Sequence, residues 1–362
     1  MAIRKTFKFR LYPTKEQARK LSETLWLCSI LYNQCLAERR DCWELGGHSV
    51  TKYEQMGRLP ELKSMDERCL HVHSQVLQDV VRRLDKTFEG FFRRVKTGEK
   101  PGYPRFKPAR RYDSFTFPQA PSGCQLQGNK LVLSKIGSVK IKLHRKVPGK
   151  IKTVTIMRQA DGWCACFSCE VEPVTLPASD KAVGVDLGLE SFAITSDEEF
   201  FESAKHLRKG ERNLKRLQRQ VSRRVKGSNR RKKAIRQLAK AHLHVANQRK
   251  NTAHKVARSL VNCYGTIAVE DLQVSNMVKN HRLAKSIHDA GWNLFINILT
   301  SKAAEAGREV VKVDPRYTSQ ACSNCGVIVP KPLSQRWHSC PCGCELHRDV
   351  NAAINILRRA IA

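Results

Sequence analysis

The run Ala182-Val183-Gly184-Val185-Asp186-Leu187-Gly188 decides the fold that the sequence predicts for the second half of this chain. Its apolar residues indicate a short buried strand whose last position carries Asp186. Gly188 then allows a close backbone approach that a bulky residue would block. A carboxylate fixed at the end of a buried strand is a rigid oxygen ligand for a divalent cation. The run therefore predicts an α/β region with an acidic site at the edge of its sheet.

Two further acids occupy comparable places in the sequence. Glu270 ends the apolar run 266–269, and Asp349 opens the helical stretch 350–357. Any single acid of this kind could be a helix cap or a surface residue, and we expect Asp271 and Asp289 to be such acids. Two of the three acids, however, end apolar strands within one α/β region. We therefore predict that folding gathers all three around Mg²⁺.

The composition points to a polyanionic partner. The 362 residues include 66 Lys and Arg against 33 Asp and Glu, a net charge of +33, which favours nucleic acid. A hydrophobic content of 41% is enough for two or three packed domains. No apolar run is long enough to span a membrane, and no signal core follows the N-terminus, so we expect an intracellular protein without a membrane partner.

The first half of the chain mixes helices with short strands. We predict a strand over 3–11, a helix from Thr14, an amphipathic helix over 72–95, and strands over 114–117, 130–133, 137–143, 154–158 and 163–172. The pairs Gly128-Asn129 and Asp161-Gly162 are typical hairpin turns. The segment 98–108 is rich in Pro and Gly and cannot be regular. It is either a loop that contacts a sugar–phosphate backbone, with Tyr103, Arg105, Phe106 and Lys107 as contacts, or an ordinary interdomain loop.

The second half of the chain contains its most basic stretch. Between residues 205 and 250, Glu211 is the only acid, while leucines recur at near-heptad spacing. This pattern predicts a helical hairpin interrupted at Gly227-Ser228-Asn229. So many like charges repel one another, which favours a polyanion contact over a merely solvated face. The predicted contacts near the interruption are Arg223, Arg224, Arg230 and Arg231.

A cysteine cluster predicts a structural zinc site. The first knuckle is Cys322-Ser323-Asn324-Cys325-Gly326, and the second is Cys340-Pro341-Cys342-Gly343-Cys344. Two such knuckles in a reducing compartment are typical of a zinc ribbon with four thiolate ligands and no open position. We expect Cys322, Cys325, Cys340 and Cys342 to bind one zinc ion, with Cys344 as an alternative ligand.

Together these motifs resemble the TnpB family, the RNA-guided nucleases encoded by bacterial insertion sequences and related to type V CRISPR effectors. The resemblance rests on Gly184-Val185-Asp186-Leu187-Gly188, Val269-Glu270-Asp271-Leu272, Asp289-Ala290-Gly291-Trp292, Thr318-Ser319-Gln320 with both cysteines of the first knuckle, and Arg348-Asp349-x-Asn351-Ala352-Ala353. Phe9-Arg10-Leu11-Tyr12-Pro13 and Gly102-Tyr103-Pro104-Arg105-Phe106-Lys107 add to it. Two features depart from the family: Cys340 and Cys342 lie one residue closer than usual, and His347 stands where an acid is common.

The resemblance implies an architecture of α/β plus β-barrel. A wedge β-barrel would comprise 1–13 and 113–178, with a helical recognition domain inserted over 14–112. An RNase H-like RuvC nuclease domain would comprise 179–313 and 346–362, with a zinc-ribbon element that binds target nucleic acid inserted over 314–345.

The resemblance also implies an activity and its partners. Asp186, Glu270 and Asp349 match the catalytic acids, which would hold about two Mg²⁺ ions. The guide RNA would come from the transposon end, and no partner transposase would be required for cleavage of double-stranded DNA. Gln75 and Gln78 fall where the family reads a short motif beside the target, and a looser alignment places Lys52 and Gln119 there. We expect a prokaryotic, cytoplasmic, nucleoid-associated protein. Two alternatives are a conventional transposase without RNA and a nuclease-inactive regulator.

Overall fold

The computed structural model describes residues 2–332 and 334–362, which form two units. The first unit is Met1–Glu172 and the second is Pro173–Ala362. Each has its own hydrophobic core, so each is described by itself below. No helix in the described part of the chain is long and apolar enough to cross a membrane.

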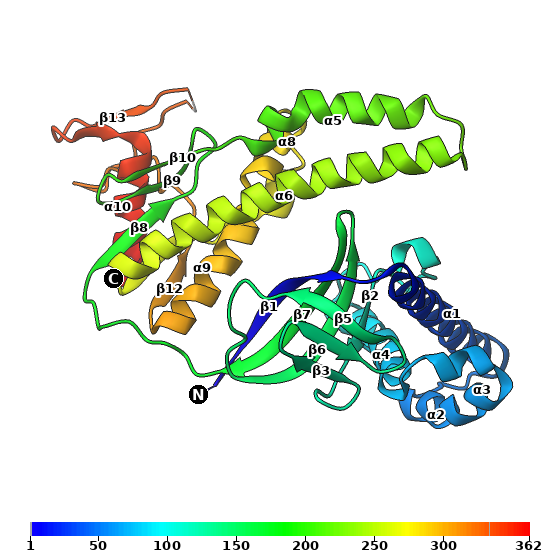
Figure 1. Ribbon diagram of the computed structural model, residues 1–362. Helices are drawn as coiled ribbons and strands as arrows, with labels where there is room; N and C mark the ends of the chain where they lie inside the picture. The colour runs from blue at the N-terminus through cyan, green and yellow to red at the C-terminus, as the bar shows by residue number, and fades with distance from the viewer. Residues whose placement is uncertain (1, 333) are drawn as a thin grey trace. The chain divides into compact units, whose positions relative to one another are not determined.

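The first unit is built on a seven-stranded antiparallel sheet that curls into a nearly closed barrel (Figure 1). Its strands are β1 (Ile3–Tyr12), β2 (Ser114–Phe117), β3 (Cys124–Gln127), β4 (Lys130–Leu133), β5 (Gly137–Lys142), β6 (Lys150–Gln159) and β7 (Gly162–Val171). The order β2-β6-β7-β1-β5-β4-β3 leaves β2 and β3 as its edges. Alternation in β1 buries Phe7, Phe9 and Leu11 and leaves Arg4 and Lys8 exposed, as the sequence predicted, whereas Lys5 and Arg10 are half-buried.

The predicted hairpin turns are largely confirmed. Gln127 pairs with Lys130, so Gly128-Asn129 forms the two-residue turn between β3 and β4. The second turn was predicted one residue too late. Gln159 pairs with Gly162, so the turn residues are Ala160-Asp161, because Gly162 already belongs to the ladder of β7. The strand β3 was not predicted; only Cys124 and Leu126 of its four residues are apolar.

Helices inserted after β1 pack on this sheet. They are α1 (Lys15–Gly46), α2 (Lys52–Gly57), α3 (Leu59–Met65), α4 (Ser74–Lys96) and the short 3-10 helices η1 (Glu67–His71) and η2 (Ala109–Arg111). The start of α1 is fixed by a capping box: the Thr14 hydroxyl accepts from the Gln17 backbone, and the Gln17 side chain accepts from the Thr14 backbone. The apolar side of α4 contributes Val76, Val80, Leu84 and neighbours to one core with α1 and the barrel.

The second unit contains a five-stranded mixed sheet in the order β10-β9-β8-β11-β12. Its strands are β8 (Ala182–Asp186), β9 (Ser191–Thr195), β10 (Phe200–Glu202), β11 (Thr266–Glu270) and β12 (Glu309–Val313). The strands β8, β9 and β10 form an antiparallel meander, whereas β11 lies parallel between β8 and β12. The three parallel strands therefore end at the same edge of the sheet.

Helices cover both faces of this sheet (Figure 1). The helices of this unit are α5 (His206–Ser222), α6 (Asn229–Cys263), α7 (Val274–Met277), α8 (His281–Ala290), α9 (Trp292–Ala306) and α10 (Arg348–Ile361). Of these, α6 and α9 pack on one face of the sheet and α10 on the other, while α5 packs against α6. The strands β13 (Trp337–Ser339) and β14 (Glu345–His347) form a separate hairpin. Val183 and Val185 of β8 face a core shared with α6 and α9. Since strand side chains alternate, Gly184 and Asp186 face the opposite side, where α10 packs.

Gly184 permits the close approach of α10, and its replacement by alanine should destabilise the second unit. A Cβ there would overlap the carbonyl oxygen of Ala353 and lie 2.7 Å from the backbone nitrogen of Leu357. We expect G184A to lower the free energy of unfolding by about 3 kcal/mol or more, measured by denaturant titration. Gly57 has no heavy atom within 4 Å of such a Cβ, so G57A is the matched control. A G184A protein as stable as G57A would contradict this packing.

Candidate functional site

The structure brings the three predicted acids to one edge of the second sheet. In β11, Ile267 and Val269 belong to the core on the α6 and α9 side, while Ala268 packs toward α10. Glu270 therefore faces α10, as Asp186 does. Val185 and Val269 are paired neighbours in parallel strands, so the acids that follow them are adjacent. Asp349, in the first turn of α10, faces them; we call these three residues the acid cluster.

The charges of the acid cluster act on Asp186. The pKa of Asp186 is raised well above its usual value, first by burial and then by the negative charges of Glu270 and Asp349. Burial also raises the pKa of Glu270, although a 2.6 Å hydrogen bond from the Thr318 hydroxyl opposes this shift. Carboxylates that repel each other's ionisation in a partly enclosed site favour a bound cation, which would relieve that repulsion.

The donor set of the acid cluster fits Mg²⁺ in its chemistry. Carboxylate oxygens on a strand end or in a first helical turn are hard ligands held by rigid elements. Among the described residues, the groups of three or more possible metal ligands with ligand atoms within 4.8 Å of one another all include cysteines. The carboxylate oxygens of the acid cluster are therefore not all within this distance of one another. Binding of cations to it would therefore include small side-chain movements.

Two arginines beside the acid cluster were missed by sequence reasoning. Arg336, from the segment between the cysteine knuckles, lies 3.9 Å from the Asp349 carboxylate and 2.8 Å from that of Glu190. Arg348 is buried and donates to the Pro332 carbonyl and the Ser319 hydroxyl, and its charge opposes the rise in the pKa of Asp186. Arg348 adjoins Asp349 in the sequence and could have been found there. Arg336 could not, because a mixed polar segment carries no spacing signal.

The predicted zinc ligands converge at the β13–β14 hairpin. The sulfurs of Cys322 and Cys342 are 3.6 Å apart, as are those of Cys325 and Cys340. All four sulfurs lie within 4.8 Å of one another. Zn–S bonds of about 2.3 Å in a tetrahedron would separate the sulfurs by roughly 3.8 Å, so the four thiols fit one zinc ion.

A second group shares one of these thiols. Cys322, His338 and Cys344 also have ligand atoms within 4.8 Å of one another, so Cys344 is close enough to remain an alternative ligand. Burial raises the pKa of Cys322, but hydrogen bonds from the backbone of Cys325, from His338 and from the Asn324 backbone outweigh it and lower the pKa to about 5. A thiolate is the form that binds zinc. His338 is fully buried and was not predicted.

Two asparagines of α10 join the cysteine knuckle to the acid cluster. The Asn351 side chain accepts from the Ser323 backbone at 2.8 Å and donates to the Ala321 carbonyl at 2.7 Å. Asn355 donates to the carbonyls of Thr318 and Ala321. Because the Thr318 hydroxyl donates to Glu270, the segment 318–323 contacts both α10 and the acid cluster and contains the first predicted zinc ligand. This segment therefore holds Glu270 in place, as residues around metal ligands commonly do.

The predicted motif-reading residues lie in the first unit, and the structure joins two of them. Gln75 and Gln78 lie one turn apart on α4, and the Gln75 amide donates to the Gln119 side chain at 2.7 Å. Lys52 instead forms an ion pair with Asp85 at 2.9 Å. Gln75 and Gln119 are therefore in contact, with Gln78 one turn along α4, while the charge of Lys52 is already paired.

The irregular segment 98–108 is anchored to the helices of the first unit. Tyr103 packs edge-on against Phe88 and Phe91, at 5.8 and 5.5 Å between ring centroids. The Arg40 guanidinium covers the Phe106 ring at 5.5 Å. The backbone of Lys107 accepts from Ser29 and Asn33, whereas Arg105 is exposed. Both rings already have protein partners, yet each stays about half exposed.

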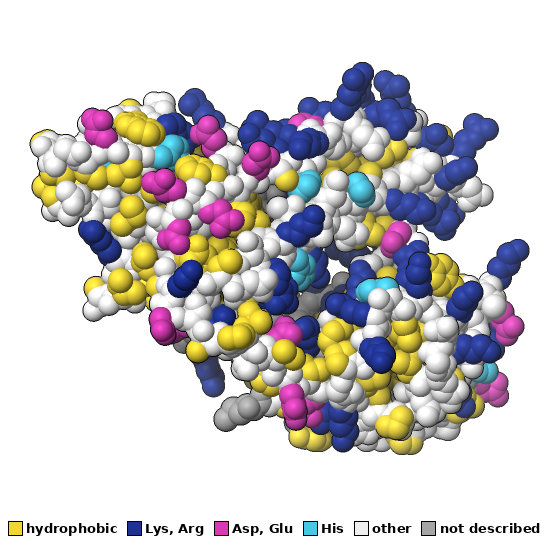
Figure 2. Space-filling model, turned by 60° about the vertical axis from the view of Figure 1, so that its left-hand side comes forward, with side chains coloured by type: hydrophobic (Ala, Val, Ile, Leu, Met, Phe, Trp, Pro, Cys, Tyr) yellow, Lys and Arg dark blue, Asp and Glu magenta, His cyan; other side chains and the backbone are white. Residues whose placement is uncertain are grey.

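The predicted cationic hairpin is confirmed as the antiparallel pair α5 and α6. Leu214, Leu217 and Val221 bury its narrow apolar seam. The four predicted contacts Arg223, Arg224, Arg230 and Arg231 lie at its tip, which we call the hairpin tip. Lys and Arg side chains crowd this part of the surface in the upper right of Figure 2. In the described part of the chain, no acid pairs with these four side chains.

The two acids predicted to be caps or surface residues are confirmed as such. Asp289 of α8 accepts from the backbone of Leu207 at 2.9 Å and of Arg208 at 3.3 Å, so it caps α5 from a distant segment. Asp271 is exposed and pairs with Lys312 at 3.3 Å.

Comparison with protein families gives three matches along the chain. A family described as "Probable transposase" matches residues 166–281, and the "Cas12f1-like, TNB domain" matches residues 292–356. A "Helix-turn-helix domain" matches residues 1–48, but the described part of this segment forms β1 and the single long helix α1.

Similar proteins cover nearly the whole chain. A protein of Streptomyces pristinaespiralis named "Putative RNA-guided DNA endonuclease" is 35% identical over 99% of this chain and 90% of its own length. The Escherichia coli protein of the same description, InsQ, is 32% identical over 97% and 91%. A solved Cas12f1 complex with guide RNA and target DNA has a TM-score of 0.63 at 14% identity and 98% coverage of both chains, which shows a shared fold.

Proposed function

Because this chain belongs to the TnpB family of RNA-guided DNA endonucleases of IS605-type insertion sequences, we propose that it cleaves double-stranded DNA at the acid cluster, guided by an RNA. The observation that carries the proposal is the meeting of Asp186, Glu270 and Asp349 on one face and at one edge of the second sheet. The sheet order, an antiparallel meander followed by parallel strands, supports an RNase H-like fold of the RuvC type.

The cleavage chemistry needs no protein nucleophile. Mg²⁺ held by Asp186, Glu270 and Asp349 would supply activation of water and stabilisation of the departing oxygen. The protein holds the acids in place: β8 and β11 fix two of them, α10 fixes the third, and Thr318 orients Glu270. Arg336, which pairs with Glu190 at 2.8 Å and lies 3.9 Å from Asp349, holds a guanidinium beside the acid cluster.

Guide and target recognition are assigned to separate surfaces. The hairpin tip binds the phosphates of a structured RNA, since its four arginines have no acidic partners in the described chain. Gln75, Gln78 and Gln119 read a short DNA motif beside the target, because glutamine amides can pair with base edges in the major groove. Sequence choice is then delegated to base pairing with the guide. Zinc held by the four-cysteine cluster is structural.

The proposed domains keep the predicted boundaries. The wedge barrel is 1–13 and 113–178, and the recognition domain is 14–112. The nuclease domain is 179–313 and 346–362, and the zinc-ribbon element is 314–345. The division of the chain between Glu172 and Pro173 supports a boundary close to the predicted end of the barrel.

Removal of positive charge from the hairpin tip should weaken RNA binding and make that binding less sensitive to salt. Replacing all four arginines by glutamine removes up to four phosphate contacts. At about 0.7 per contact for single strands, the slope of log K against log salt should become shallower by up to about 3. Binding titrations at several salt concentrations measure this slope. The matched control replaces the same arginines by lysine, which keeps the charge; an unchanged slope in the glutamine variant would exclude the tip as an RNA contact.

The function is tested by expressing the gene with its flanking DNA and sequencing the RNA that copurifies. The complex is then mixed with Mg²⁺ and a plasmid library with randomised bases beside the target. Guided cleavage that disappears after RNase treatment supports the proposal. Activity on transposon ends without RNA would indicate a conventional transposase, and binding without any Mg²⁺-dependent cleavage would indicate a regulator.

A further inference from the structure

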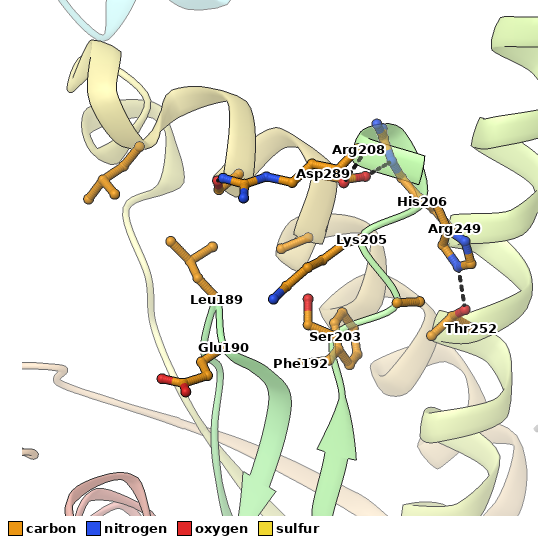
Figure 3. A pocket seen from close by; sticks show the side chains of 14 residues that line it. Leu189, Glu190, Phe192, Ser203, Lys205, His206, Arg208, Arg249, Thr252 and Asp289 are labelled. Carbon is orange, nitrogen blue, oxygen red and sulfur yellow. Dashed lines mark hydrogen bonds and ion pairs between the residues drawn. The ribbon is translucent and has the colours of Figure 1, made fainter. Parts of the chain in front are cut away.

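A cavity of about 360 Å³ lies in the second unit, next to the β8–β9 turn (Figure 3). Its walls come from that turn, from the segment that leads into α5, from α6 and from α8. The side chains that matter below are Leu189, Glu190, Lys205, Arg208, Arg249 and Leu283. A volume of this size is typical of sites that hold a small molecule or one unit of a polymer.

Asp289 makes the frame of this cavity rigid. Its side chain is only 7% exposed and accepts from the backbone of Leu207 and Arg208 and from the Arg249 guanidinium at 3.0 Å. Three elements are thereby held together, because Asp289 belongs to α8, Arg249 to α6 and the two backbone donors to α5. Protein donors fully use this carboxylate, which also neutralises Arg249.

Two cations remain for a ligand. Lys205 extends into the middle of the cavity in Figure 3, and Arg208 donates to the Ser286 hydroxyl at 3.1 Å. Neither forms an ion pair with an acid in residues 2–332 and 334–362. The other acid on the wall, Glu190, is neutralised by Arg336 at 2.8 Å. The free charge of the cavity is therefore positive, which suits a phosphate group.

The cavity adjoins the acid cluster. Glu190 follows Asp186 by four residues, and four residues span at most about 14 Å even when fully extended. Arg336 also bridges the two places, since its guanidinium contacts both Glu190 and Asp349. A strand with a phosphodiester at the acid cluster would thus have its neighbouring nucleotides within reach of Lys205.

We infer that this cavity binds one nucleotide of the DNA strand being cut, with Lys205 and Arg208 holding its phosphate and Leu189 and Leu283 contacting its base. The inference rests on the proposed function and assigns a subsite to it. Apolar contact with a base face is tolerant of sequence, as a guided nuclease requires. The subsite fixes the strand beside the acid cluster, so that the phosphodiester to be cut is presented in one register.

The test compares Lys205→Gln and Arg208→Gln with Arg282→Gln, which removes the same charge from an exposed position of α8 outside the cavity. Each complex, loaded with its copurified RNA, is assayed for single-turnover cleavage of a guided target. We expect K205Q and R208Q each to slow cleavage about tenfold, as loss of a charge-assisted contact implies, and R282Q to cleave as the wild type does. Affinity for the RNA should be unchanged in all three variants.

A second measurement locates the contact on the DNA. Neutral methylphosphonates are placed one at a time at the phosphates on either side of the cut. At one position, the methylphosphonate should slow cleavage by the wild type about tenfold but should not slow cleavage by K205Q any further. The reason is that the methylphosphonate and the Lys205 substitution remove the same contact. Independent effects at every position, or cleavage by K205Q and R208Q at the rate of R282Q, would overturn the subsite.

The outcomes separate this inference from the function beneath it. Weakened RNA binding by K205Q would overturn the inference, since the cavity would then hold RNA, while leaving guided cleavage intact. Absence of cleavage by the wild-type complex would instead refute the proposed function itself.

Discussion

Replacement of Asp186 by alanine should abolish guided DNA cleavage while leaving RNA binding intact. The change removes one of three carboxylates at the edge of the second sheet, whose charges already interact. Metal-assisted stabilisation of the transition state is worth several kcal/mol, so the single-turnover rate should fall by about 10³-fold or more. The hairpin tip lies at the far end of α5 from the acid cluster, and RNA affinity should stay within about twofold of the wild type.

The matched control for this variant is Asp271→Ala. Asp271 follows Glu270 directly but is exposed and paired with Lys312, so it lies outside the acid cluster. We expect D271A to cleave at close to the wild-type rate. Thermal unfolding of D186A should also show no loss of stability, because burial and the neighbouring carboxylates disfavour the ionised form of Asp186 in the folded protein. Full cleavage by D186A would refute the acid cluster as the catalytic site.

Loss of zinc should unfold the knuckle segment and stop cleavage together. Apparent binding free energies of structural zinc are about 10–16 kcal/mol, so Cys340→Ser, which removes one of four clustered thiols, should sharply reduce zinc content. The effect should reach the acid cluster, because Asn351 holds the knuckle and Thr318, in the same segment, orients Glu270. Zinc per chain by elemental analysis and the cleavage rate are the two measurements.

Cys344→Ser is the control that decides the ligand set. Cys344 lies near Cys322 and His338 but outside the four-sulfur group, so C344S should keep about one zinc per chain and its activity. Zinc retained by C340S and lost by C344S would show that Cys344 replaces Cys340 as the fourth ligand. Full cleavage by a zinc-free C340S protein would contradict the proposal that the zinc knuckle supports the acid cluster.

Local patterns in the sequence predicted most regular elements and the positions of the acids. The strand predicted over 114–117 is observed as Ser114–Phe117, and the near-heptad spacing of Leu214, Leu217 and Val221 predicted the seam of the α5–α6 hairpin. Apolar residues that recur every two residues in a strand, or every 3.6 residues in a helix, lie on one buried face. Such a pattern is encoded within a few consecutive residues. The same logic did not predict β3, in which only Cys124 and Leu126 are apolar.

Contacts between segments that are distant in the sequence could not be predicted from these local patterns. Nothing local indicates that Arg336 lies beside Asp349, that Asp85 neutralises Lys52, or that Asp289 caps a helix by accepting from Leu207, 82 residues earlier. These pairings depend on which surfaces of helices and sheets meet.

The sequence by itself determined where the acids, the cysteine knuckles and the basic helices stand along the chain, because residue type and spacing carry that information. Only the tertiary structure decided that Asp186, Glu270 and Asp349 share one face, that the knuckle is attached to α10, and that a cationic cavity adjoins the acids. The physical reason is that a side chain's direction follows its own strand or helix, whereas its neighbours are set by how those elements pack.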